Sequence, residues 1–226
     1  SSTSSSEKHT TMNFDHDLFL LLNFDGGTTL DRVMLTLSGT TMWLPLYALI
    51  LWLVWRRNGW QRTLLFCVLI LLAVALADMV AGIFKHSGLL GGLCPDLEPR
   101  LRPMFTPALE GLDITPDSLA VLRRAAPADA SWVVHVPQGA LAGRYGTVSA
   151  HASTTVALAL LSAGIIRRRW FTWVMVIATL LICYSRIYLA KHFPMDIVWG
   201  AALGAVLGWA GCRLYRIIGR RLPERK

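Results

Sequence analysis

The sequence predicts an all-α integral membrane protein, a bundle of about five transmembrane helices. Of its 226 residues, 54% are hydrophobic and only 16% are charged, a balance that is rare in soluble domains of this size. The apolar residues also lie in long runs, and about 20 such residues cross a hydrocarbon core. The predicted spans are Val33–Trp55, Thr63–Phe84, Val148–Ile166, Trp170–Tyr184 and Ile197–Ile218.

The basic residues indicate how the bundle is oriented. The net charge is +8, and arginines are concentrated between spans one and two, between spans three and four, and in the C-terminal tail. By the positive-inside rule these segments are cytoplasmic, so the loop over residues 85–147 faces outward. Membrane topology therefore accounts for the positive charge, and no nucleic-acid partner is predicted.

Segments outside the spans carry predictions of their own. Residues 1–12 are polar and of low complexity, and we expect them to be disordered or a remnant of cloning. Residues 13–226 then form a single membrane domain. Phe14–Asp25 mixes acids with a face of Leu and Phe, which predicts an interfacial helix on the outer leaflet.

The outer loop is too long to be a simple connector. Within it, Thr115 followed by Pro116 is typical of a helix start, which predicts a small helical cap over the membrane surface. In the last span, Gly200, Gly204 and Gly208 recur at four-residue spacing. This smooth face predicts close packing against another helix.

Ionisable residues gather at the outer ends of four predicted spans. Lys85 ends the second span, His151 begins the third, Arg186 ends the fourth, and His192 and Asp196 precede the fifth. Ionisable side chains at membrane depth are costly and are candidates for function. The sequence therefore predicts one polar site at the outer rim of the bundle.

The spacing of these residues indicates chemistry on phosphorus. Asp196 lies four residues after His192, so the two can meet across the first turn of the last helix. A carboxylate that holds one imidazole nitrogen makes the other a better nucleophile, and His151 could serve as the general acid. No metal or cofactor is needed in this scheme. The predicted phosphate ligands are Lys85, Arg102, Arg186, Ser149 and Ala150.

Three short motifs resemble the type 2 phosphatidic acid phosphatase (PAP2) superfamily. The pattern Ser185-Arg186-x5-His192-x3-Asp196 matches its third signature residue for residue. "VSAH", which ends at His151, resembles the second signature, Pro-Ser-Gly-His. "RLRP", over residues 100–103, resembles the end of the first, whose opening lysine we place at Lys85. The resemblance covers residues 78 to 212.

The chain departs from the family pattern at two places. Val148 and Ala150 replace the proline and glycine of the second motif, which alters the backbone near the predicted donors. Arg102 follows Lys85 by seventeen residues, where the family pattern has seven. An insertion therefore separates the two predicted phosphate ligands.

The resemblance implies a metal-independent bacterial lipid phosphatase with a phosphohistidine intermediate. In it His192 attacks, Asp196 orients His192, and His151 donates a proton to the departing group. Further candidates for phosphate contact are Arg100, Ser185 and Arg144. The implied location is the inner membrane, crossed several times, with the site facing the periplasm.

Several alternatives stay open at this level. Undecaprenyl diphosphate is the favoured lipid phosphate substrate, followed by lipid A and then phosphatidylglycerol phosphate. A phosphotransferase that passes the phosphate to another lipid is a different enzymatic class. Non-enzymatic alternatives are a haem-binding protein and a proton relay. The sequence predicts neither the oligomeric state nor a role for Asp78.

Overall fold

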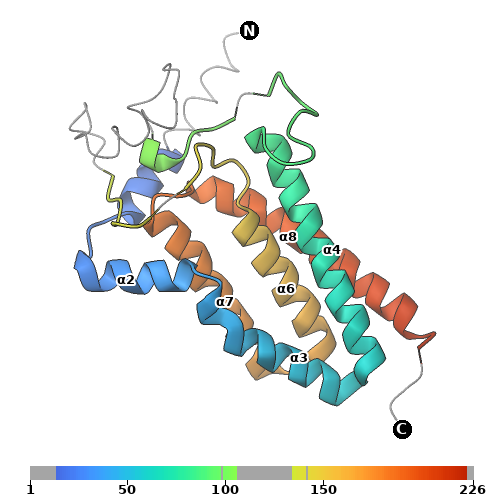
Figure 1. Ribbon diagram of the computed structural model, residues 1–226. Helices are drawn as coiled ribbons and strands as arrows, with labels where there is room; N and C mark the ends of the chain where they lie inside the picture. Colours follow the sequence, from blue (N-terminus) through green and yellow to red (C-terminus); the bar gives the residue numbers. More distant parts are fainter. Residues whose placement is uncertain (1–13, 98, 106–133, 141, 223–226) are drawn as a thin grey trace.

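The computed structural model describes residues 14–97, 99–105, 134–140 and 142–222. Over these residues the chain forms a helical bundle, with one isolated β-bridge between Leu101 and Tyr145 (Figure 1). A helical segment at 14–22 comes first. It is followed by α2 (Gly27–Ser38), η1 (Thr41–Trp43), α3 (Leu44–Asn58), α4 (Trp60–Lys85), η2 (Pro103–Phe105), α6 (Ala150–Ile166), α7 (Arg169–Tyr188) and α8 (Pro194–Gly219). The predicted all-α fold is confirmed.

Helices α4, α7 and α8 are long and apolar enough to cross a membrane, within the described part of the chain. They contain 26, 20 and 26 residues and correspond to the second, fourth and fifth predicted spans. Helix α6, at the third predicted span, is apolar but has only 17 residues. The short loop Arg167–Arg168 makes α6 and α7 antiparallel neighbours. It lies where the sequence has a run of arginines between the third and fourth predicted spans.

The first predicted span, Val33–Trp55, is wrong as a single helix. Helix α2 and the segment Thr41–Asn58 meet at an angle of 68°. Helix α2 ends where Gly39 takes an extended conformation, and the indole N–H of Trp43 donates to the Leu37 carbonyl at 2.8 Å. This bond replaces a helical hydrogen bond lost at the break. By length and composition the described helices make three spans, or up to four with the bent pair counted as one.

The glycine face of α8 packs against α6, as predicted. A Cβ atom on Gly200 would lie 2.5 Å from the carbonyl oxygen of Ser149, and one on Gly204 would overlap the carbonyl of Ser153. The two backbones can therefore approach this closely only because side chains are absent. The contact fixes the N-terminal ends of α6 and α8 beside one another.

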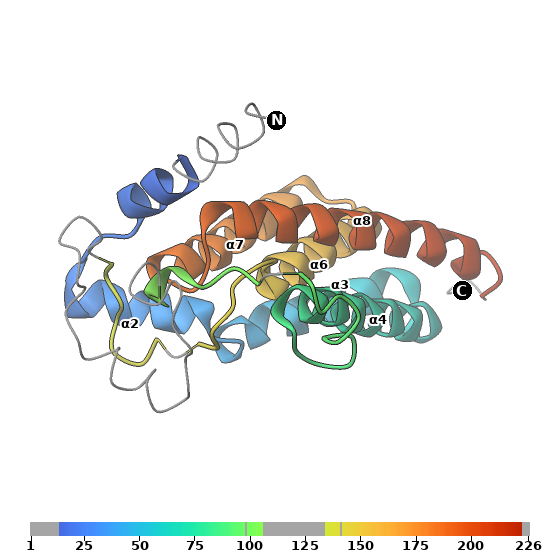
Figure 2. The same cartoon turned by 90° about the horizontal axis from the view of Figure 1, so that it is seen from above.

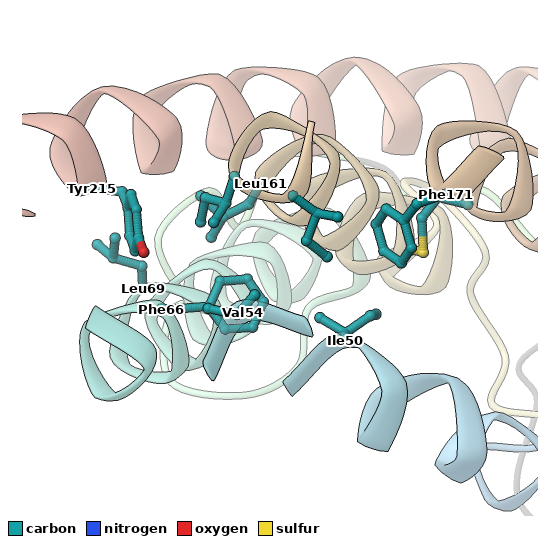
Figure 3. Close-up of a cluster of buried hydrophobic side chains, with 10 residues drawn as sticks. Ile50, Val54, Phe66, Leu69, Leu161, Phe171 and Tyr215 are labelled. Atoms are coloured by element: carbon teal, nitrogen blue, oxygen red, sulfur yellow. The ribbon is translucent and has the colours of Figure 1, made fainter. Parts of the chain in front are cut away.

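The core of the bundle lies between α3, α4, α6, α7 and α8. Figure 3 shows its buried apolar side chains, which include Ile50, Val54, Phe66, Leu161 and Phe171. The outer surface is apolar as well, since large side chains are exposed there, among them Leu71, Trp173, Val206 and Trp209. Extensive exposed apolar surface of this kind is typical of a lipid-facing protein.

The predicted helix at Phe14–Asp25 is present over residues 14–22. Figure 2 shows it in dark blue, at the end of the bundle where α8 begins. Its Phe19 is fully buried and meets the ring of Phe193 edge to face, with centroids 5.3 Å apart. The short helix is thus attached to the start of α8. The predicted cap helix after Thr115 lies outside the described residues.

Candidate active site

The segment between α7 and α8 is a tight turn that holds His192 in the interior. Ala190 has a φ of 51°, and the Lys191 N–H donates to the Arg186 carbonyl at 3.0 Å. Pro194 then starts α8, as expected of proline in a first turn. Asp196 accepts from the Phe193 N–H at 2.9 Å, which caps the new helix. His192 is 1% exposed and Asp196 is 2% exposed.

The His192 ring is oriented chiefly by a backbone carbonyl. Its Nδ1 lies 2.8 Å from the Gly146 oxygen and 3.8 Å from Oδ2 of Asp196. Since a carbonyl only accepts, Nδ1 carries the proton and donates it, and Nε2 keeps its lone pair. The predicted contact with Asp196 exists at ion-pair distance, but the hydrogen bond that fixes the tautomer comes from Gly146. Sequence reasoning missed this residue.

The surroundings of His192 keep its ring neutral. Burial lowers the pKa of His192 well below its ordinary value of 6.5. The positive charges of Arg102, Arg186 and Lys85 lower that pKa further, and the weaker opposing effect is the hydrogen bond to Gly146. A neutral imidazole with a free Nε2 is the form that a nucleophile needs.

Cations from three separate segments, Lys85, Arg102 and Arg186, act on this ring electrostatically. Arg186, 6% exposed, donates from Nη1 to the hydroxyl of Ser38, a residue of α2 that the sequence did not indicate. Its Nε is buried and has no hydrogen-bond acceptor among the described residues. A buried guanidinium N–H without an acceptor costs roughly 1–3 kcal/mol, which a ligand oxygen would remove.

The inserted segment returns Arg102 to the vicinity of Lys85. Residues 86–97 form successive turns, and the Arg102 N–H donates to the Arg144 carbonyl at 3.1 Å. Arg102 Nη1 donates to the Lys191 carbonyl at 3.0 Å, and burial lowers the pKa of Arg102 to about 10. The charges of Lys85 and Arg102 act on one another. The two predicted ligands are thus together despite the insertion.

Lys191 is a further cation that the motifs do not include. Burial lowers the pKa of its ammonium to about 8, and the charges of Arg186 and Arg102 contribute to the shift. Lys191 directly precedes His192 in the sequence. The signal for it was present, since Lys191 lies between the motif residues Arg186 and His192.

The start of α6 brings His151 to the same end of the bundle. Ser149 is the N-cap, and its hydroxyl accepts from the Ala152 N–H at 3.4 Å. His151 is exposed, and Arg186, His192 and Lys191 act on its ring electrostatically. Val148, a β-branched residue, has a φ of 54°, a strained conformation of a kind that clusters at functional sites.

One predicted role at the start of α6 needs correction. The Ser149 N–H was expected to be available to phosphate, like that of Ala150. Instead it donates to the carbonyl of Asp196 at 3.0 Å, so it joins α6 to α8. Helix α6 approaches α8 so closely here that the Ser149 N–H forms a hydrogen bond between the two helices.

The further candidates for phosphate contact have other partners. The Ser185 hydroxyl is buried and donates to the Ile182 carbonyl within α7 at 2.7 Å. The guanidinium of Arg144 lies over the ring of Tyr145, 5.5 Å from its centroid. Arg100 lies at ion-pair distance from both Asp15 and Asp196, at 2.7 and 3.7 Å. Arg100 therefore belongs to the site through Asp196.

A cavity of about 620 Å³ adjoins the cluster. Its walls come from the α2–α3 bend, α4, α6 and α7, and most of its lining is apolar, including Leu46, Ile50 and Phe66. His151 lines it too, which connects the cavity with the His192 cluster. Asp78, which had no predicted role, also lines it. Such a cavity suits a molecule with one polar end and long apolar chains.

Among the described residues, one group could hold a metal ion: Asp25, Asp31 and His135. His135 Nε2 lies 2.8 Å from Oδ1 of Asp31, which also accepts from the Tyr188 hydroxyl at 2.7 Å. These bonds join the segment over residues 134–140 to α2 and to the end of α7. The group is distinct from the His192 cluster.

The sequence matches the family model of the PAP2 superfamily over residues 68–220. The chain belongs to the PAP2 superfamily. The match contains α6, α7 and the segment with His192, and it confirms the resemblance found in the motifs. Membership also confirms the predicted enzyme class, a membrane lipid phosphatase, over the haem-binding and proton-relay alternatives.

Two similar proteins cover nearly the whole chain. A lipid A 4'-phosphatase of Bacteroides thetaiotaomicron is 29% identical over 213 residues, 93% of this chain and 80% of that protein. A lipid A 4'-phosphatase of Porphyromonas gingivalis is 25% identical over 201 residues, 89% of this chain and 72% of that protein.

The fold is similar to that of a PAP2-type transmembrane phosphatidylglycerolphosphate phosphatase from Bacillus subtilis, whose crystal structure is known. The TM-score is 0.58, with 16% identity, and the match covers 96% of this chain and 90% of the other. At this identity the likeness concerns the fold alone. It supports the helical membrane architecture of this PAP2 protein.

Proposed function

We propose that the protein removes a phosphate group from a phosphorylated glycolipid of the lipid A class. Support for the glycolipid comes from the two lipid A 4'-phosphatases, which are similar to this chain over 93% and 89% of its length. The sequence alone favoured undecaprenyl diphosphate. That lipid and phosphatidylglycerol phosphate are therefore the competing substrates in any assay.

The observation that carries a phosphate site is the environment of Arg186, whose Nη1 donates to Ser38 while its Nε does not. Its buried Nε lacks an acceptor among the described residues, while the charges of Lys85 and Arg102 lie nearby. Like charges held together in a buried place repel one another, and a phosphate would relieve the repulsion. Its non-bridging oxygens would accept from the three cations, as in other phosphoryl-transfer sites.

The geometry supports a two-step reaction. Nε2 of His192 attacks phosphorus, the bond to the lipid oxygen breaks, and His151 gives that oxygen a proton. In the second step His151 takes a proton from water, whose oxygen attacks phosphorus. The phosphohistidine bond then breaks, which releases phosphate and restores His192. The Gly146 carbonyl accepts from Nδ1–H throughout, with the Asp196 carboxylate nearby at 3.8 Å, and no metal takes part in this scheme.

The apolar cavity beside His151 supports a lipid substrate. Acyl chains placed between the α2–α3 bend, α4 and α6 would bring the phosphate to the polar end of the cavity. Burial of each methylene contributes about 0.8 kcal/mol, so several chains would hold the lipid firmly. We place the site on the periplasmic face of a bacterial inner membrane, on the basis of the arginine distribution.

The test is release of phosphate from purified lipids by the detergent-solubilised protein. We expect lipid A phosphates to be hydrolysed faster than undecaprenyl diphosphate or phosphatidylglycerol phosphate, with activity that persists in EDTA. His192→Ala should remove activity and leave the thermal transition unchanged. An active His192→Ala protein would contradict the proposed nucleophile, and loss of activity in EDTA with recovery in magnesium would contradict the metal-free scheme.

Two controls separate the remaining alternatives. Phosphate recovered on an added lipid alcohol, instead of in solution, would indicate a phosphotransferase. For orientation, Cys94 is exposed in the outer segment, and the other three cysteines lie within helices. A membrane-impermeant maleimide should label Cys94 in spheroplasts, and labelling only after lysis would reverse the proposed orientation.

A further inference from the structure

A second cavity, of about 520 Å³, lies at the opposite end of the bundle from His192. It is formed where α3 ends, where α4 starts, and where α6 and α8 end. Helix α4 runs from this cavity to Lys85, and its 26 residues span roughly 39 Å at about 1.5 Å per residue. The cavity is therefore separate from the candidate active site.

The lining of this cavity is strongly basic. Arginines line it from α3, from α4, from the turn after α6 and from the end of α8 with its C-cap: Arg57, Arg62, Arg167, Arg216 and Arg220. Nη1 of Arg57 also donates to the Ile166 carbonyl. No carboxylate occurs among the described residues that line it. Five like charges around one space create a positive potential that favours an anion there. The arrangement goes beyond a basic loop, because it converges on a hollow.

A buried hydroxyl in the same cavity also points to a ligand. Tyr215 is 8% exposed, and its hydroxyl is buried with no hydrogen-bond partner among the described residues. Figure 3 shows its ring extending from α8 toward α4. Arg62 is close enough to the phenol to act on it electrostatically. A buried hydroxyl without a partner costs roughly 1–3 kcal/mol, so an acceptor in the cavity would stabilise this end of the bundle.

We propose that this cavity binds a phosphate group, with Tyr215 and the surrounding arginines as donors. Guanidinium groups pair with phosphate through two parallel hydrogen bonds, and the volume suits a head group of that size. The phosphate could belong to an anionic phospholipid or to a soluble phosphate compound. Exposed Trp60 and Trp170 lie where α4 and α7 begin, at this same end of the bundle, and such residues are typical of a membrane interface, which favours the phospholipid. The proposal does not rest on the phosphatase activity.

The test measures thermal stability in lipid nanodiscs. The purified full chain is placed in phosphatidylcholine alone, in phosphatidylcholine with phosphatidylglycerol, and in phosphatidylcholine with added inorganic phosphate. Binding should raise the Tm by about 2–4 °C per kcal/mol of binding free energy. The double variant Arg62→Gln/Arg216→Gln should lose the rise. Arg168→Gln/Arg169→Gln is the matched control, because it removes the same charge from the same end outside the cavity.

Each outcome bears on the proposal. A rise with phosphatidylglycerol only assigns the site to a lipid head group, whereas an equal rise with inorganic phosphate assigns it to a soluble anion. Tyr215→Phe removes one hydroxyl without changing the charge, and it should reduce the rise even if the double variant fails to fold. If neither probe raises the Tm, or if the variants of the cavity keep the rise, the proposal is wrong.

Discussion

Arg100 and Asp15 form an ion pair that joins the N-terminal helix to the candidate active site. Arg100 Nη1 lies 2.7 Å from Oδ2 of Asp15 and 3.7 Å from Oδ1 of Asp196. The other oxygen of Asp15 accepts from the Met195 N–H at 2.9 Å, within the first turn of α8. The guanidinium of Arg100 also covers the ring of Phe193 at 3.8 Å. A helix expected only to lie on the membrane thus contacts the segment that carries His192 and Asp196.

Asp15→Asn should therefore lower kcat about 10-fold and change KM little. The amide removes the negative charge that holds Arg100, so Asp196 and the start of α8 lose a fixed neighbour. Steady-state kinetics on the best lipid substrate measures the effect.

Asp17→Asn is the matched control for this variant, because Asp17 is an exposed acid on the same short helix. It should leave both constants unchanged. Equal losses in the two variants would show that the charge of the helix matters rather than the ion pair, and would contradict a positioning role for Asp15.

Gly146→Ala should lower kcat/KM by about 10- to 100-fold, because the added methyl group would displace side chains of the site. A Cβ atom at Gly146 would lie 3.1 Å from Cγ of Arg102 and 3.3 Å from Oδ2 of Asp196, both closer than usual contacts. Either these side chains move or the Gly146 carbonyl moves away from His192. Gly143→Ala, where the added atom meets nothing within 4 Å, should retain activity. Full activity of Gly146→Ala would remove the carbonyl from the proposed mechanism.

The helices were predictable where one physical cause dominates. Long apolar runs predicted α4, α7 and α8, since only burial in lipid or protein explains them. The bend after α2 was not, because the two helices form one continuous apolar run and Gly39 alone is a weak signal. The break depends on the tertiary contact of the Trp43 indole with the Leu37 carbonyl, which a sequence does not display.

Some residues of the candidate site could be predicted from the sequence and others could not. His151, Arg186, His192 and Asp196 were predictable as site residues from motif spacing, because the proposed chemistry needs those side chains. The roles of Gly146 and Ser149 were not, since they act through backbone atoms that every residue type possesses. Asp15 was visible only as an acid on an amphipathic helix, and its partner Arg100 lies 85 residues later in the chain.

The pH dependence of kcat/KM should show a fall above pH 8. Burial, with Arg186 and Arg102, lowers the pKa of Lys191 to about 8, so the ammonium loses its charge above that pH and attracts phosphate less. Because the pKa of His192 lies well below 6.5, its protonation causes no loss at neutral pH. Lys191→Arg should move the alkaline fall to higher pH, since a guanidinium keeps its charge. If the fall in kcat/KM above pH 8 is the same in Lys191→Arg, another group causes it.

Gly204→Ala should destabilise the bundle by about 1–3 kcal/mol, because the new methyl group would overlap the Ser153 carbonyl on α6. The two helices would have to separate, which also disturbs the placement of His151 relative to His192. Gly219→Ala, on the same helix, meets nothing within 4 Å and should be neutral or slightly stabilising. Thermal unfolding in detergent measures both variants. Equal stability of the two would contradict the glycine contact between α6 and α8.

The role of His151 can be tested through the leaving group. A lipid sugar alkoxide is a poor leaving group and needs a proton as the bond to phosphorus breaks, whereas p-nitrophenolate leaves without one. His151→Gln should therefore lose about 10²- to 10⁴-fold in kcat on the lipid and less on p-nitrophenyl phosphate. The same variant also lacks the base for the second step. A phosphohistidine should therefore accumulate on the enzyme when p-nitrophenyl phosphate is the substrate, and acid-labile ³²P labelling of the protein should detect it. Equal losses on both substrates, with no trapped intermediate, would show that His151 only binds phosphate. His192→Ala should give no label with either substrate, which distinguishes the acceptor of the phosphoryl group from the proton donor.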